Sequence, residues 1–285
     1  MKKGNVRKQP CIFCPRKDLT QEHIFGKWTA SVMPKTYASH NDAVTHGQVF
    51  PDGHRVSGPV QTLTREGDPI SRRHRVVCKG CNTGWMSRLQ DQSKPILRPL
   101  ITGDDVILDA SQQATLANWI TMVTMTAEYL TRSTAMIPRE EREVFRWKHA
   151  APNNWTILIG RCREEEFTTR YAKHSMHYPW DSGPLLLGVR PLHNIQTTTI
   201  VIGHFLCFAF STYFPADVSI RIPDHIGSRL AAIHPVRDYS SLALTMTAPL
   251  SSDDIHTIYD LLPNSFPINP VFHVPLPSNW QKRND

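Results

Sequence analysis

The sequence predicts an α+β protein of two regions: short strands, turns and one helix in residues 1–100, and a mixed α/β region in residues 101–285. Three observations lead to this prediction. Two Cys-x-x-Cys pairs, at 11–14 and 78–81, stand in the first hundred residues. Two prolines and the turn-forming run at 102–105 mark a boundary after them. Helix-like and strand-like apolar patterns then follow one another through the rest of the chain.

The composition is typical of a folded soluble protein. Of the 285 residues, 40% are hydrophobic and 20% are charged, so the chain does not have the low hydrophobicity of disordered proteins. The opening MKKGNVRKQP runs into a cysteine pair without the apolar stretch of a signal peptide, and we therefore expect a cytoplasmic protein. The most apolar later stretch, 199–214, contains His204 and many β-branched and aromatic residues, which favours two adjacent strands over a membrane span.

Positive charge is concentrated in the N-terminal region. The formal net charge is +7. Residues 1–100 contain 17 Lys and Arg against 7 Asp and Glu, a net of +10, whereas residues 101–285 contain 15 against 18, a net of −3. This asymmetry indicates a polyanionic partner, most simply nucleic acid, because Lys and Arg contacts to phosphates release counterions. Solubility is the alternative explanation of the charge.

The N-terminal region is expected to form a hairpin followed by a helix. Residues 50–54, Phe-Pro-Asp-Gly-His, read as the turn of a hairpin between β-prone flanks. A strand at 73–77 then leads to the second cysteine pair. After Cys81, a helix carries Trp85, Met86 and Leu89 on one face, and we expect Pro95 and Pro99 to end it.

The C-terminal region is expected to combine helices with strands. Apolar residues at helical spacing predict a core helix over 111–130, and Pro138 begins another that reaches about residue 148. Strands are predicted at 155–159, 185–189, 197–202 and 205–210, and a last helix at 253–262. Cys162 and Cys207 have no partner at ligand spacing and are expected to be buried thiols.

The two cysteine pairs predict one structural zinc ion held by Cys11, Cys14, Cys78 and Cys81. Cytosolic thiols stay reduced, so a metal explains the pairs better than disulfides do. Each pair places two sulfurs on a tight knuckle, and two knuckles complete the tetrahedron that zinc prefers. The gap of 63 residues between the pairs is long for a compact finger. Redox chemistry is the alternative for either pair alone.

Three further residues near the two knuckles, together with the cysteines, make up a sequence pattern. Glu22 and His23 follow the first pair, and Asn82 follows the fourth cysteine directly. This order, C-x-x-C, acidic-His, C-x-x-C-Asn, resembles the HNH, or His-Me finger, endonucleases of the treble-clef zinc type. The resemblance covers about residues 11–92 and implies a zinc-stapled ββα-metal (HNH) domain in residues 1–100, with a mixed α/β domain of unknown role after it.

The resemblance implies a role for each of the three residues. His23 corresponds to the general base, which suits an imidazole because its ordinary pKa lies near working pH. Glu22 and Asn82 correspond to the protein ligands of a catalytic Mg²⁺ or Mn²⁺, a hard cation that prefers oxygen ligands. The alternative is that Glu22 and His23 are a solvated pair on a loop, and that Asn82 caps its own helix.

The sequence departs from the family pattern at two places. Glu22 stands where Asp is more common, and no Asn precedes Cys78 in the position of the middle residue of the HNH name. His74 lies in that stretch, where a solvent-facing strand residue is the expected role. Basic residues surround the second knuckle and are predicted to contact phosphates: Arg72, Arg73, Arg75, Lys79 and Arg88.

These observations predict a metal-dependent endonuclease that hydrolyses phosphodiester bonds, with DNA as the expected substrate. Nucleases of this kind are common in phages, mobile elements and anti-phage defence, which is context by analogy. A non-catalytic zinc module that binds nucleic acid or protein is the alternative. Residues 101–285 are expected to recognise a sequence, bind a regulatory ligand, or form a homodimer or a complex with a partner protein. They contain no Gly-rich phosphate loop, nucleophile elbow or paired-carboxylate motif, which speaks against a second enzyme there.

Overall fold

The structure is a computed structural model that describes residues 9–33, 39–49, 55–57, 61–66, 72–163, 168–177, 194–213, 220–235, 241–244 and 248–264. Its helical segments are η1 (Lys27–Ser31), α1 (Lys79–Cys81), η3 (Asn82–Met86), α2 (Ser87–Thr102), α3 (Ala110–Ala127), η4 (Glu128–Thr134), α4 (Arg139–Lys148), α5 (Asp224–Gly227), α6 (Ser252–Tyr259) and α7 (Leu261–Asn264). Its strands are β1 (Leu19–His23), β2 (Ser39–Val49), β3 (Arg55–Ser57), β4 (Gln61–Glu66), β5 (Arg73–Cys78), β6 (Ile107–Leu108), β7 (Trp155–Arg161), β8 (Thr168–His177), β9 (Ile195–Gly203), β10 (Phe205–Thr212), β11 (Ala231–His234) and β12 (Leu242–Ala243). The fold is mixed α and β, as predicted.

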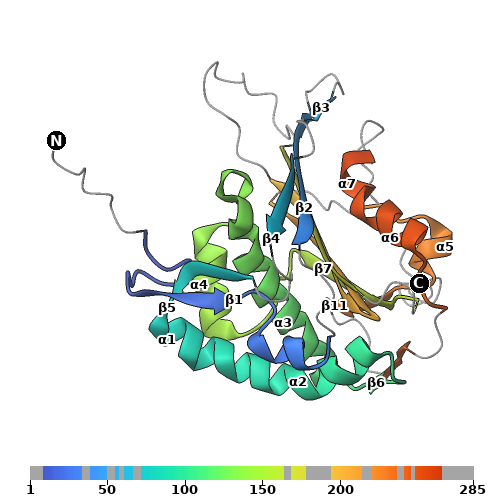
Figure 1. Cartoon of the computed structure of the whole chain (residues 1–285), viewed down its shortest axis with the longest axis horizontal. Coiled ribbons are helices and arrows are strands. Elements are labelled where there is room, and N and C mark those ends of the chain that lie inside the picture. The colour runs from blue at the N-terminus through green and yellow to red at the C-terminus, as the bar shows by residue number, and fades with distance from the viewer. Residues whose placement is uncertain are drawn as a thin grey trace, which may run out of the picture.

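An eight-stranded sheet forms the centre of the molecule. Its strand order is β11-β7-β10-β9-β8-β2-β3, and β4 also pairs with β2. The β2–β8 pair is parallel, whereas the other pairs in this sheet are antiparallel. Helices α2 and α3 cover one side of the sheet, and α5, α6 and α7 lie on the other (Figure 1). Since β2 comes from the N-terminal part of the chain, both predicted regions contribute strands to one sheet, and the boundary after residue 100 stays a prediction.

Most of the elements expected from apolar patterns are present. The predicted core helix is α3, which η4 continues, and the helix expected from Pro138 is α4. Strands β7, β9 and β10 and helix α6 occupy the other predicted positions. The apolar stretch around His204 is the antiparallel pair β9–β10, as expected. The strand predicted at 185–189 lies outside the described residues.

The strand pair before the helix is not the predicted one. The expected hairpin exists as β2 and β3, with Val49 opposite Arg55, although its turn at 50–54 lies outside the described residues. However, β2 belongs to the large sheet through its pairing with β8. The strands that precede the helical segment are instead β1 and β5, which form a separate two-stranded antiparallel sheet. Leu19, at the start of β1, lies opposite Cys78, at the end of β5. The cysteine cluster therefore lies at the end of the strand pair where these two residues meet.

The prediction that Pro95 and Pro99 end the helix is wrong. Helix α2 continues through both prolines to Thr102 and ends at Gly103, whose φ of 85° is left-handed. The prolines are four residues apart and lie away from the buried face, which consists of Leu89, Ile96, Leu97, Leu100 and Ile101. Burial of this apolar face outweighs the backbone hydrogen bonds that the prolines remove.

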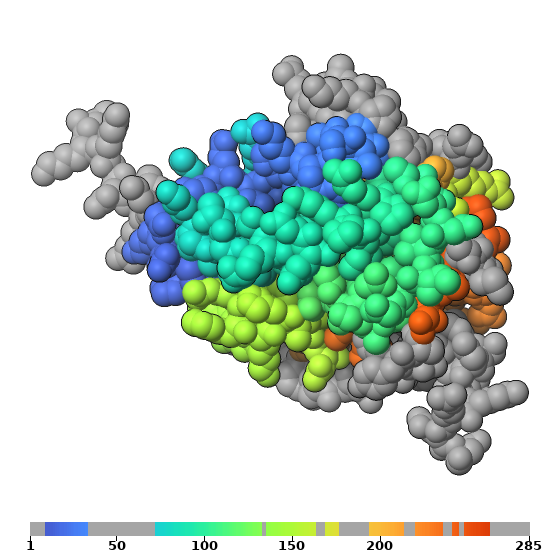
Figure 2. Space-filling model, turned by 90° about the horizontal axis from the view of Figure 1, so that it is seen from below, coloured from blue at the N-terminus to red at the C-terminus, as the bar shows by residue number. Residues whose placement is uncertain are grey.

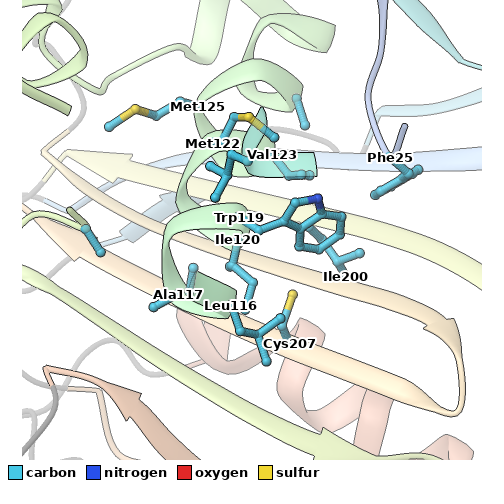
Figure 3. Packing of buried hydrophobic residues seen from close by; sticks show 14 of the residues in the cluster. Phe25, Leu116, Ala117, Trp119, Ile120, Met122, Val123, Met125, Ile200 and Cys207 are labelled. Carbon is cyan, nitrogen blue, oxygen red and sulfur yellow. The ribbon is translucent and has the colours of Figure 1, made fainter. Parts of the chain in front are cut away.

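The core joins the N-terminal segment to the rest of the molecule. Trp119 of α3 is fully buried and lies among Phe25, from the loop after β1, and Ile200 and Cys207 of the sheet (Figure 3). Cys162 and Cys207 are buried, as predicted. A second apolar cluster lies between the other side of the sheet and α6 and α7, and contains Phe208, Phe210 and Ile255.

No helix in the described part of the chain combines the length and the apolar character needed to cross a membrane.

Candidate metal centres

The four predicted cysteines form one buried cluster. Their sulfur atoms all lie within 4.8 Å of one another. The Cys14 and Cys78 sulfurs are 3.5 Å apart, and the Cys81 and Cys14 sulfurs 3.8 Å. Four thiolates around zinc, with bonds of about 2.3 Å, lie about 3.8 Å from one another in a tetrahedron, whereas a disulfide brings two sulfurs to about 2 Å. The cluster is therefore compatible with one zinc ion and not with disulfides.

Contacts within the cluster favour a thiolate at Cys11. The backbone N–H of Phe13 points to the Cys11 sulfur at 3.5 Å, and that of Cys81 to the Cys78 sulfur at 3.4 Å. A hydrogen bond with Cys81 lowers the pKa of Cys11 to about 5, although burial opposes this, while the same contact raises the pKa of Cys81. Zinc requires deprotonated cysteines. Within the first knuckle, Cys11 thus favours the ionised form that a metal needs, whereas burial raises the pKa of Cys14.

The two knuckles are held together by backbone hydrogen bonds and by an aromatic contact. The N–H of Ile12 donates to the carbonyl of Val76 at 3.0 Å, and the N–H of Lys79 to the carbonyl of Asp18 at 3.2 Å. Trp85 packs edge-on against Phe13, with ring centroids 5.1 Å apart, and is buried as expected. Figure 2 shows the surface of the segment from residue 73 through α2 (cyan) running between residues 9–33 (blue) and the α4 region (yellow-green).

Glu22 and Asn82 meet next to this cluster, although they are 60 residues apart in the sequence. The Asn82 side-chain amide donates to the Thr20 hydroxyl at 3.1 Å and to the Gln21 carbonyl at 3.4 Å. Burial raises the pKa of the Glu22 carboxyl to about 7, and a hydrogen bond from Asn82 opposes this rise. Asn82 therefore spans from the helical segment to β1, and the residues at the N-cap positions are Cys78 for α1 and Cys81 for η3. The alternative in which Asn82 only caps its own helix did not predict these hydrogen bonds to β1.

The register of β1 and β5 places His23 and His74 on opposite sides of the strand pair. His74 lies opposite Glu22, and Arg73 lies opposite His23. Residues directly opposite each other in an antiparallel pair share one side, and neighbours along a strand alternate. Alternation therefore assigns His74 to the Glu22 side of the strands and His23 to the other side, at the end of β1. His74 is half-buried, so the expected solvent-facing role does not describe it.

The surroundings of His23 keep its imidazole neutral. Burial lowers the pKa of His23, and the positive charges of Arg73 and Lys27 lower it further. Lys27, at the start of η1, was not singled out from the sequence, because only the fold brings it near β1. A neutral imidazole flanked by cations is able to accept a proton and lies where an anionic substrate would be attracted.

Most of the basic residues that flank the second knuckle and are predicted to contact phosphates have exposed side chains. Arg73, Arg75, Lys79 and Arg88 are exposed, whereas Arg72 is half-buried. Arg16, which the sequence prediction passed over, is exposed, and its guanidinium lies against the backbone of Gly80 in the second knuckle. Its position in the sequence, two residues after Cys14, is the signal from which Arg16 could have been predicted.

Comparisons of the chain with protein-family models, with curated proteins and with solved structures give no match. A proposal for the function therefore depends on the residues and the geometry described above.

Proposed function

We propose that the protein is a metal-dependent endonuclease of the HNH type, and that it cleaves phosphodiester bonds in DNA. The observation that carries this proposal is the placement of the Asn82 side chain against β1 beside Glu22, through its hydrogen bonds to Thr20 and Gln21 next to the cysteine cluster. An antiparallel strand pair followed by a helix, with a Cys₄ zinc site at its base, is the arrangement that the resemblance implies for this activity. In the proposal, zinc is bound by the four cysteines and has a structural role.

The donor set at Glu22 fits a hard divalent cation. A carboxylate and a side-chain amide oxygen are ligands that Mg²⁺ and Mn²⁺ accept. The Asn82 amide presents its nitrogen to Thr20 and Gln21, so in the proposal the amide rotates to bring its oxygen to the metal. Among the described residues, no Lys or Arg forms an ion pair with Glu22, and burial disfavours its charge. A bound cation would remove that penalty. When bound there, Mg²⁺ or Mn²⁺ would polarise the scissile phosphate and stabilise the leaving 3′ oxygen.

His23 activates the attacking water in the proposed reaction. Its neutral imidazole accepts one proton while the water oxygen bonds to phosphorus, and the bond from phosphorus to the 3′ oxygen breaks. The products carry a 5′ phosphate and a 3′ hydroxyl. Arg73 lies opposite His23 and is exposed, so it is positioned to hold a backbone phosphate. Arg72, Arg75, Lys79 and Arg88 extend this basic surface around the second knuckle.

Plasmid nicking tests the proposal. Purified zinc-loaded protein should convert supercoiled plasmid to the nicked form when Mg²⁺ or Mn²⁺ is added, and DNA ligase should seal the nick because it carries a 5′ phosphate and a 3′ hydroxyl. His23→Ala should slow nicking by about 10²-fold or more, and Glu22→Gln should raise the metal concentration required. His256→Ala, an exposed histidine on α6, is the matched control.

Two outcomes would contradict the mechanism. Nicking that survives His23→Ala but is lost in His74→Ala would assign the base to the histidine on the Glu22 side of the strands. Absence of nicking with every divalent metal tested, together with retained DNA binding, would support the alternative of a non-catalytic zinc module.

A further inference from the structure

A small cavity lies behind the β1–β5 pair, away from Asn82. Its volume is about 210 Å³, and the first knuckle, the two strands and the η4–α4 corner enclose it. Leu19 and Val76 line it. Their neighbours Thr20 and Val77 lie on the other side of the strands, where Asn82 bonds to Thr20. Glu22, His23 and Asn82 do not line the cavity, which is therefore separate from the proposed catalytic site.

Three arginines line the cavity, and no Asp or Glu does so among the described residues. Arg132 of η4 is exposed and forms no ion pair with the described residues. Arg139, the first residue of α4, donates to Glu143 at 2.9 Å on the surface, which leaves its other N–H groups available. Arg142 is 1% exposed. Two of these cations lie at the rim of the cavity, and the third is buried.

Neighbouring groups fix Arg142 in place. Its terminal nitrogens donate to a carboxylate oxygen of Glu128 and to the carbonyl of Met125, and its Nε donates to the carbonyl of Ile137. Its guanidinium lies 4.8 Å from the centre of the Tyr129 ring, which also lines the cavity. Five N–H groups are available on a guanidinium, so one on each terminal nitrogen is left after these bonds. Glu128 is itself balanced by Lys173, at 3.8 Å, as well as by Arg142.

We infer that this cavity binds a phosphate monoester carried on a small sugar. A guanidinium matches phosphate with two parallel hydrogen bonds, and three convergent arginines favour a doubly charged anion over a carboxylate. The apolar wall of Ile12, Leu19 and Val76 accepts the uncharged part of the ligand. The volume is below the roughly 300 Å³ of sites for drug-sized molecules, so the buried part of the ligand is no larger than a sugar phosphate. Two kinds of molecule carry such a phosphate monoester, namely a free sugar phosphate and the 5′ end of a nucleic acid.

Calorimetric titration of the zinc-loaded full chain, without added Mg²⁺ or Mn²⁺, tests the inference. Ribose 5-phosphate should bind at one saturable site, and ribose should not bind. The double variant Arg132→Gln, Arg139→Gln should weaken binding by about tenfold or more. Arg146→Gln, a half-buried residue of α4 that does not line the cavity, should bind as the natural chain does. Arg142 is left intact because its removal would disturb the buried ion cluster.

A tetranucleotide with and without a 5′ phosphate separates the two sources. A phosphorylated tetranucleotide that binds about tenfold more tightly than ribose 5-phosphate assigns the site to a nucleic-acid end, and equal or weaker binding assigns it to a free sugar phosphate. The inference is overturned if neither phosphate monoester saturates at millimolar concentration, or if the double variant binds them as tightly as the natural chain. None of these results depends on nuclease activity.

Discussion

Replacement of Gln90 by Leu should destabilise the protein more than its single side chain suggests. The Gln90 Oε1 atom accepts hydrogen bonds from two indole N–H groups, that of Trp28 at 3.0 Å and that of Trp119 at 3.0 Å. It thereby joins η1, α2 and α3. Leu fits the apolar surroundings and has a helix propensity close to that of Gln. The substitution therefore removes the acceptor, together with the buried Gln90 Nε2 group, which has no hydrogen-bond partner among the described residues.

The expected loss follows from the two donors. Trp119 is fully buried, so its N–H meets neither water nor a new acceptor, whereas Trp28 is half-buried. A buried donor left without a partner costs about 1–3 kcal/mol. Removal of the unpartnered Gln90 Nε2 group offsets part of this loss. With the smaller cost assigned to Trp28, the free energy of unfolding should therefore fall by about 1–3 kcal/mol. Urea unfolding followed by tryptophan fluorescence measures this change.

Gln92→Leu is the matched control, because Gln92 lies on the exposed face of the same helix. Its effect should stay within about 0.5 kcal/mol. If Gln90→Leu were no more destabilising than Gln92→Leu, the shared acceptor would contribute nothing and the reasoning would be refuted.

Three further predictions concern the zinc cluster, a helix cap and the buried ion cluster. Cys78→Ser should lose the bound zinc, measured by emission spectroscopy, together with the fold around the knuckles, because metal binding energy here is folding energy; retention of one zinc per chain would contradict the assignment. Hydrogen bonds from Arg229 and Ser251 outweigh burial and hold the pKa of Asp254 at about 2, below its unfolded value of about 3.9. Its stabilising contribution is therefore present above pH 4 and lost as the pH falls towards 2, so Asp254→Asn should destabilise by about 1 kcal/mol at pH 6 and by less at pH 2.5 in thermal unfolding; an equal effect at both pH values would contradict it. Arg142→Leu leaves the buried Glu128 with Lys173 as its cation and with the backbone N–H groups of Met136 and Ile137, and should lower the unfolding free energy in urea by about 3–5 kcal/mol; a loss below about 1 kcal/mol would show that the Arg142–Glu128 pair contributes little to stability.

The parts of the structure that the sequence predicted are those specified by local pattern. Cysteine spacing is a local signal, and it identified all four members of the cluster. Apolar residues at helical spacing identified α3, and β-branched runs on both sides of His204 identified β9 and β10. In these segments the residues that set the secondary structure are also the residues that are buried.

The parts that the sequence did not predict depend on contacts between distant segments. Nothing near Pro95 shows that the face of α2 opposite to it would be buried against α3 and the sheet. The hairpin at 50–54 was recognised, but its place in the large sheet depends on β8, more than a hundred residues later. The same holds within the candidate site, where only the register of β1 and β5 separates the sides of His23 and His74.

Anomalous diffraction from crystals of the zinc-loaded protein soaked in Mn²⁺ tests the central claim most directly. Data collected on both sides of the zinc and manganese absorption edges distinguish the two metals. The account predicts a zinc peak among Cys11, Cys14, Cys78 and Cys81, and a separate manganese peak within coordination distance, about 2.2 Å, of the Glu22 carboxylate and the Asn82 side-chain oxygen. A zinc peak at the cysteines without any manganese at Glu22 and Asn82 would contradict the proposed catalytic centre and leave the cysteine cluster as a structural site alone.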